Sequence, residues 1–124
     1  MADMSQGPGG TFPKSLKTAS GTLTADTDVV AAVVGKRIKV YAYSLITTGV
    51  NANARIFKSN GTSGTELWRV ILQAPAASSL FGANLAVTPP AFIFATAAGE
   101  KLTLDVGDTD PIHYSIAYWD DDAS

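Results

Sequence analysis

The stretch that decides the fold of this chain is Pro90–Trp119, PAFIFATAAGEKLTLDVGDTDPIHYSIAYW. It holds three short apolar runs separated by two turns, at Ala97–Glu100 and at Gly107–Pro111. Within the runs, apolar side chains alternate with polar or small ones, and a period of two is typical of β-strands. Almost no residue in this stretch is suited to catalysis. We therefore expect a rigid β module that binds a partner.

The period of two continues through the rest of the chain. Val29–Val34 fits either a short strand or one helical turn, and its valines favour strand. Asn60-Gly61, flanked by two alternating runs, predicts a hairpin. Further strands are expected at residues 15–24, 36–48, 53–59, 65–73 and 80–88. About eight short strands with turns between them and no convincing helix predict an all-β fold, a single antiparallel β-sandwich or jelly roll.

The longest predicted strand is Lys36–Thr48. Strict alternation divides its side chains between two faces. We predict that the smaller, apolar face packs on the core, namely Ile38, Val40, Ala42, Ser44 and Ile46. The opposite face begins basic and ends aromatic, with Arg37, Lys39, Tyr41, Tyr43 and Leu45.

The chain divides into three predicted parts. Residues 1–13 are expected to form a flexible N-terminal arm, because Gly7-Pro-Gly-Gly supports neither helix nor strand. Residues 14–119 form the β-sandwich domain. Residues 120–124, Asp-Asp-Asp-Ala-Ser, are expected to form a solvated acidic C-terminal tail.

The composition of the 124 residues limits the classes of partner. The formal net charge is −2, which gives no basic surplus for nucleic acid or for an anionic membrane. Only 16% of residues are charged, whereas an ordinary domain has about a quarter. The surface must therefore be rich in small, uncharged side chains, which is common in proteins that pack against neighbours.

The N-terminal sequence has no basic segment followed by an apolar one, as a signal peptide would have. No apolar run approaches the roughly 20 residues that span a bilayer. We therefore expect the chain to be made and folded in a cytosol.

The sequence offers little for chemistry. It has no cysteine, which excludes disulfides, thiolate metal sites and cysteine nucleophiles. His113 is the single histidine, and acid–base catalysis needs partners within hydrogen-bond reach. Asp105, Asp108 and Asp110 faintly resemble a calcium loop, but no Glu and no flanking helices complete the EF-hand pattern, so a polar turn is expected. We expect no enzyme, no cofactor and no metal.

Two clusters could instead bind a partner. Lys36, Arg37 and Lys39 form a small basic group whose likeness to a single-strand nucleic-acid platform is superficial, and we expect them to be solvated or paired with acidic residues on a neighbouring subunit. Trp68 is expected to pack in the sandwich. Trp119 either packs at the rim or offers an aromatic surface to a sugar or a protein.

Several segments together suggest a family. They are Lys36–Leu45, Ile56–Ser59, Phe94–Leu104 and the tyrosine-rich closing strand. In this order they resemble small virion proteins of tailed bacteriophages, which are β-sandwich or jelly-roll modules. The most recognisable element is Ala97–Leu104, a turn followed by Gly-Glu-x-Leu-x-Leu.

The resemblance implies a capsid decoration, or cement, protein, a class that is often trimeric. Such a protein is made in the host cytoplasm, binds the major capsid protein on the capsid exterior and bridges neighbouring capsomers. The alternative is a glycan- or receptor-binding module of a tail fibre or baseplate, using Tyr118 and Trp119. A metal-binding jelly-roll enzyme would need several histidines. The residues expected to contact a partner are Phe12, Pro13, Lys36, Arg37, Lys39, Tyr118 and Trp119.

Overall fold

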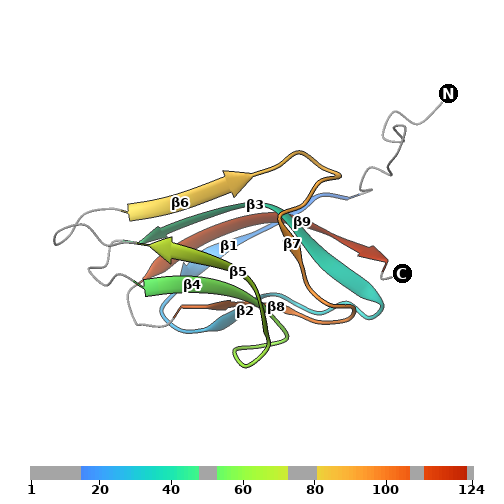
Figure 1. The fold of residues 1–124 in the computed structure, drawn as a ribbon, viewed down its shortest axis with the longest axis horizontal. Helices are drawn as coiled ribbons and strands as arrows, with labels where there is room; N and C mark the ends of the chain where they lie inside the picture. Colours follow the sequence, from blue (N-terminus) through green and yellow to red (C-terminus); the bar gives the residue numbers. More distant parts are fainter. Residues whose placement is uncertain (1–14, 48–52, 73–80, 107–110, 123–124) are drawn as a thin grey trace.

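The computed structural model describes residues 15–47, 53–72, 81–106 and 111–122, which form two antiparallel sheets packed face to face (Figure 1). The predicted all-β sandwich is confirmed. In the described ranges no helix has the length and apolar character needed to cross a membrane. The predicted arm, residues 1–13, lies outside these ranges.

Sheet A has the strand order β1-β9-β3-β6, and the short strand β7 also pairs with β3. Its strands are β1 (Lys17–Leu23), β9 (Ile112–Asp122), β3 (Lys36–Thr47), β6 (Phe81–Ala86) and β7 (Phe94–Ala95). Sheet B has the order β2-β8-β4-β5. Its strands are β2 (Thr27–Val30), β8 (Leu102–Asp105), β4 (Asn53–Ser59) and β5 (Thr65–Leu72).

The core between the sheets is mostly apolar and contains an aromatic cluster, but the charged side chain of Arg55 is also fully buried. Phe57 lies at its centre, with its ring centroid 4.9 Å from that of Phe94 and 5.7 Å from that of Tyr43. Trp68 stacks on Phe94 and donates its indole N–H to the Tyr43 hydroxyl at 3.0 Å. The expected packing role of Trp68 is thus met, and its polar atom has a partner.

A bulge in β3 changes which side chains face the core. The β9 register passes from Val40–Tyr118 directly to Ala42–Ala117, so Tyr41 is an extra residue on β3. A β-bulge of this kind reverses the alternation that follows it.

The prediction for β3 is therefore correct before the bulge and wrong after it. Ile38 and Val40 are buried as expected. Beyond the bulge the core-facing residues are Tyr43, Leu45 and Thr47, whereas Ala42, Ser44 and Ile46 face outward.

Two further predictions can be compared with the structure. Asn60-Gly61 does connect β4 to β5, and both residues have positive φ, 70° and 96°. The predicted tail is wrong for its first three residues, because Asp120–Asp122 are the last residues of β9. They pair with Lys36–Ile38 of β3, so strand pairing extends through the acidic run.

Candidate docking surfaces

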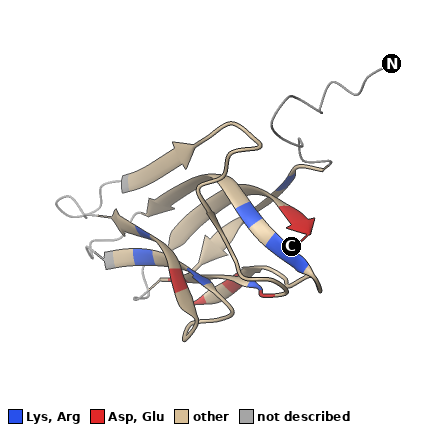
Figure 2. Cartoon of the chain, turned by 45° about the vertical axis from the view of Figure 1, so that its right-hand side comes forward, with Lys and Arg blue, Asp and Glu red and all other residues tan. Residues whose placement is uncertain are grey.

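Charged residues lie along the strands of sheet B (Figure 2), and several of them form ion pairs on its outer face. Lys58 of β4 contacts Asp105 of β8 at 2.8 Å, and Arg69 of β5 contacts Glu66 at 2.6 Å. A third pair joins Lys101 to Asp28 at 2.9 Å. This hydrated, charged face suits contact with water, since drawing ion pairs out of water is costly.

The hydrogen bonds of Asp28 affect its titration. Lys101 and the hydroxyl of Thr103 both bond to its carboxylate and hold its pKa below the usual value of 3.8. The bond from Arg69 likewise lowers the pKa of Glu66. These carboxylates therefore stay ionised at neutral pH.

The outer face of sheet A is built differently. Two rows of side chains cross its four long strands, and they hold only small or uncharged groups. We call these rows the small-residue face. One row is Thr18, Ala117, Ala42 and Ala86, and the other is Ser20, Ser115, Ser44 and Asn84.

A shallow hollow of about 350 Å³ lies within the small-residue face. It runs across β9, β3 and β6, and no charged side chain lines it. It exists because the β3 bulge turns Ala42 and Ser44 outward, where their short side chains leave the sheet uncovered. The lining residues are Ala42, Tyr43, Ser44, Asn84, Leu85, Ala86, Ser115 and Ala117.

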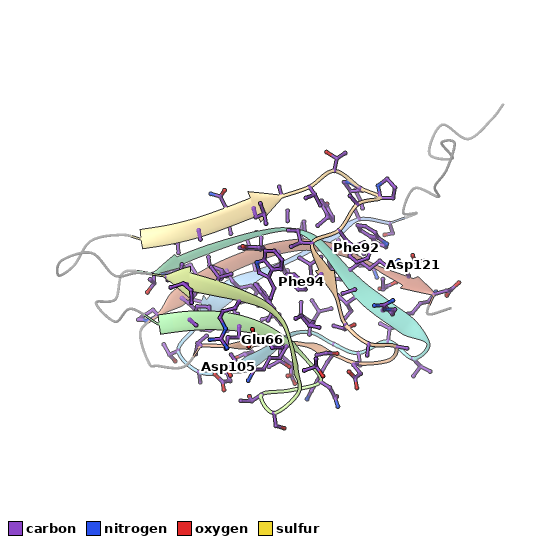
Figure 3. The ribbon with its side chains drawn as sticks, viewed as in Figure 1. Glu66, Phe92, Phe94, Asp105 and Asp121 are labelled. Carbon is purple, nitrogen blue, oxygen red and sulfur yellow. The ribbon has the colours of Figure 1, made fainter. Side chains whose placement is uncertain are left out.

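Three ion pairs lie at one end of sheet A, where β3 begins and β9 ends, and we call them the ion-pair ladder. Lys17 of β1 contacts Asp120 at 2.8 Å. Two lysines of β3 continue the ladder, with Lys36 bound to Asp122 and Lys39 bound to Asp121. Figure 3 labels Asp121 at this end of the sheet.

The ladder affects the ionisation of its members. The hydrogen bond from Lys39 holds the pKa of Asp121 below its usual value of 3.8. The bonds to Asp120 and Asp122 raise the pKa of Lys17 and Lys36, respectively. The lysines predicted to meet a partner, Lys36 and Lys39, thus already pair within the chain.

The other residues predicted to contact a partner have varied surroundings. Arg37 donates its Nε–H to the backbone oxygen of Thr96 at 3.0 Å. Tyr118 lies opposite Val40, on the core side of the sheet, and is partly buried. Phe12 and Pro13 lie outside the described residues.

Trp119 points to the opposite side of β9 from Tyr118 and is covered by other aromatic rings. Its indole is only 4% exposed. Its ring centroid lies 5.7 Å from that of Tyr41 and 6.3 Å from that of Phe92, whose ring is nearly perpendicular to it. Phe92, labelled in Figure 3, is 41% exposed and carries the Lys39 ammonium 5.0 Å from its ring centroid. The aromatic group presented to solvent is therefore Phe92, which its position after Pro89-Pro90 did not reveal.

Two turns lie beside the ion-pair ladder, and we call them the paired turns. Their tip, the residues before Lys36 and before Glu100, is uncharged. The first is Val33–Lys36, closed by a bond from the Lys36 N–H to the Val33 carbonyl at 3.0 Å. The second is Ala97–Glu100, closed in the same way at 3.1 Å. Each has a glycine with positive φ in its third position, Gly35 at 74° and Gly99 at 71°. The sequence predicted the second turn, but not that the first lies beside it.

Few side chains in the described ranges are suited to catalysis or to metal binding. No cluster of three or more His, Asp or Glu residues is arranged there to hold a metal ion. His113 is exposed, and its Nδ1 lies 2.9 Å from the Thr22 hydroxyl. Of the predicted acidic turn, Asp105 pairs with Lys58, whereas Asp108 and Asp110 lie outside the described residues.

Neither a protein-family model nor a curated protein matches this chain. The surfaces described above are therefore the basis for a functional proposal.

Proposed function

We propose that this chain is a non-enzymatic structural protein of a tailed-phage virion, a capsid decoration (cement) protein. In this role it binds the major capsid protein on the outer shell and stabilises neighbouring capsomers. It acts as a homo-oligomer, a trimer in the proposed assembly, and reaches the capsid exterior after synthesis in the host cytoplasm.

The observation that carries the assembly role is the contrast between the two outer faces. Sheet B presents ion pairs, whereas sheet A, away from the ion-pair ladder at its end, presents two rows of Ala, Ser, Thr and Asn side chains. Small side chains lose little conformational entropy when they are covered. An uncharged face also avoids the cost of removing ions from water. The small-residue face therefore suits close packing against protein.

The phage assignment depends on the resemblance of Lys36–Trp119 to small virion proteins. The most recognisable element, Ala97–Leu104, comprises the second paired turn and most of β8. The proposal assigns shell attachment to the arm, residues 1–13. Restraint at many equivalent sites would then hold capsomers against the pressure of the packaged DNA.

The test is co-sedimentation of the purified chain with empty shells that lack it. We expect the full chain to pellet with shells and the chain lacking residues 1–13 to stay in the supernatant. A second variant, Ser115→Glu, places a charge on the small-residue face and should weaken binding at least tenfold. Thr65→Glu makes a similar change at an exposed position of sheet B and serves as its control.

The outcomes separate the two roles that the sequence suggested. Failure of the full chain to pellet with shells contradicts the decoration role. Binding to cell-surface polysaccharide without binding to shells would instead support a glycan-binding module of a tail fibre or baseplate. That alternative is less well supported, because Trp119 is covered by Tyr41 and Phe92.

A further inference from the structure

The paired turns expose apolar side chains that no residue described by the structure covers. Val34 is 96% exposed, and its neighbour Val33 is 39% exposed. Ala31, Ala32, Ala97 and Ala98 are also exposed, so the tip has no charged side chain between Ala31 and Gly35 or between Ala97 and Gly99. Exposed apolar groups that cluster in this way mark interaction sites.

The tip is held rigidly. The Gly99 N–H donates to the Lys36 carbonyl at 2.7 Å and joins the two turns. Beneath them, the buried Ser59 hydroxyl donates to Glu100 at 2.6 Å and accepts the Ala97 N–H at 3.1 Å. The buried Thr96 hydroxyl accepts the Ile38 N–H at 3.0 Å. A protruding group that is already ordered loses less entropy on binding.

The chemistry of the tip favours a protein over a lipid surface. Segments that bind membranes combine large apolar or aromatic groups with free Lys or Arg. The tip offers only Ala, Val and Gly. The nearest lysines, Lys36 and Lys101, pair with Asp122 and Asp28.

A second uncharged surface lies elsewhere on the same chain. The hollow on the small-residue face is lined by uncharged residues, among them Ala42, Ser44 and Ala117. The Val34 turn immediately precedes Lys36, the first residue of β3, whereas the hollow lies at Ala42–Ser44 of that strand. At about 3.3 Å per residue they are roughly 25 Å apart along β3, so a chain's own tip is remote from its own hollow.

We propose that the Val33–Val34 tip of one copy seats in the hollow of a second copy. A contact between two different surfaces of identical chains is head-to-tail, and it forms a ring if the rotation closes. Both surfaces are uncharged, so the contact desolvates no ion. It extends the proposed function by giving the small-residue face one occupant, a neighbouring copy of this chain.

The test measures the mass of the full chain in solution by sedimentation velocity over a range of concentrations. We expect the wild type to form oligomers of at least twice the monomer mass. Val34→Asp damages the tip and Ser44→Glu damages the hollow, so each variant alone should be monomeric. Circular dichroism reports whether both variants keep the native strand content.

Mixing the two variants supplies the decisive measurement. The Val34→Asp chain keeps an intact hollow, and the Ser44→Glu chain keeps an intact tip. An equal mixture should therefore form a dimer with one intact contact. Any further contact would place the Val34→Asp tip of the first variant against the Ser44→Glu hollow of the second. These like charges repel each other, so the assembly should stop at two chains.

The controls place the same changes elsewhere. Ile71→Asp replaces an apolar residue that is 62% exposed on sheet B, and Thr65→Glu adds a charge there. Both should assemble as the wild type does. A wild type that stays monomeric, an oligomer that survives Val34→Asp, or a mixture that stays monomeric overturns the proposal. A monomeric chain that still pellets with shells would leave the decoration role intact.

Discussion

The backbone N–H of Gly99 donates to the carbonyl oxygen of Lys36 at 2.7 Å, and this single bond joins two turns that lie 60 residues apart in the chain. It connects the start of β3 to the loop before β8. Each side of the contact depends on a glycine with positive φ. The most exposed apolar residue described, Val34, owes its position to this arrangement.

Replacing Gly99 by Ala should destabilise the fold. A Cβ added at Gly99 meets nothing closer than 3.9 Å, so the cost arises from its φ of 71° and not from a clash. Holding a residue with a Cβ in the left-handed region costs roughly 1–2 kcal/mol. Urea denaturation should show a loss of this size for Gly99→Ala and a change within about 0.5 kcal/mol for Ala98→Ser. An unchanged unfolding midpoint for Gly99→Ala would contradict the assigned turn.

Removing the hydroxyl of Thr96 should be costly as well. That oxygen is fully buried and accepts the backbone N–H of Ile38. Thr96→Val keeps the shape but leaves a buried donor without this acceptor, at a cost of about 1–3 kcal/mol. Hydrogen exchange should accelerate at the Ile38 amide. The exposed Thr88→Val is the matched control, and equal effects of the two changes would disprove the role of the hydroxyl.

Acid should weaken the end of sheet A. Because Lys39 lowers the pKa of Asp121 in the folded chain, this carboxylate stabilises the fold above its unfolded pKa of 3.8. That contribution is lost as the pH falls through the lower, folded value. Asp28 and Glu66 shift in the same direction. Denaturation midpoints measured from pH 7 to pH 3 should fall less steeply for Asp121→Asn than for the wild type, and parallel curves would count against the ladder.

Removing the ring of Phe92 should expose Trp119 to water. The Phe92 ring packs nearly perpendicular to this indole, which also contacts Tyr41. In a Trp68→Phe background, Phe92→Ala should shift the tryptophan emission to longer wavelength and increase quenching by acrylamide. Emission that stays unchanged would show that Phe92 does not cover the indole.

Elements with local signals were predictable. The Asn60-Gly61 hairpin follows from residues that accept positive φ, and both residues adopt it. The Ala97–Glu100 turn likewise contains its own glycine. Alternation placed Ile38 and Val40 in the core for the same reason, since a period of two is a property of the strand itself.

The predictions that were wrong concern residues whose surroundings depend on pairing with a strand that is distant in the sequence. Nothing adjacent to Tyr41 marks it as a bulge, because the bulge exists only relative to β9. Asp120–Asp122 had the composition of a solvated tail, yet three lysines from β1 and β3 neutralise them. A charge run joins a strand when its partners come from segments that are remote in sequence.

The amino-acid sequence by itself determined that the chain forms β-strands, where several turns lie and how few groups could perform chemistry, because these properties depend on neighbouring residues. Only the tertiary structure decided which faces are available. In the folded chain Trp119 is buried, Ser44 faces outward, and the Val33–Lys36 turn lies beside Gly99. These outcomes depend on contacts between strands that are distant in the chain, and a period of two carries no information about them.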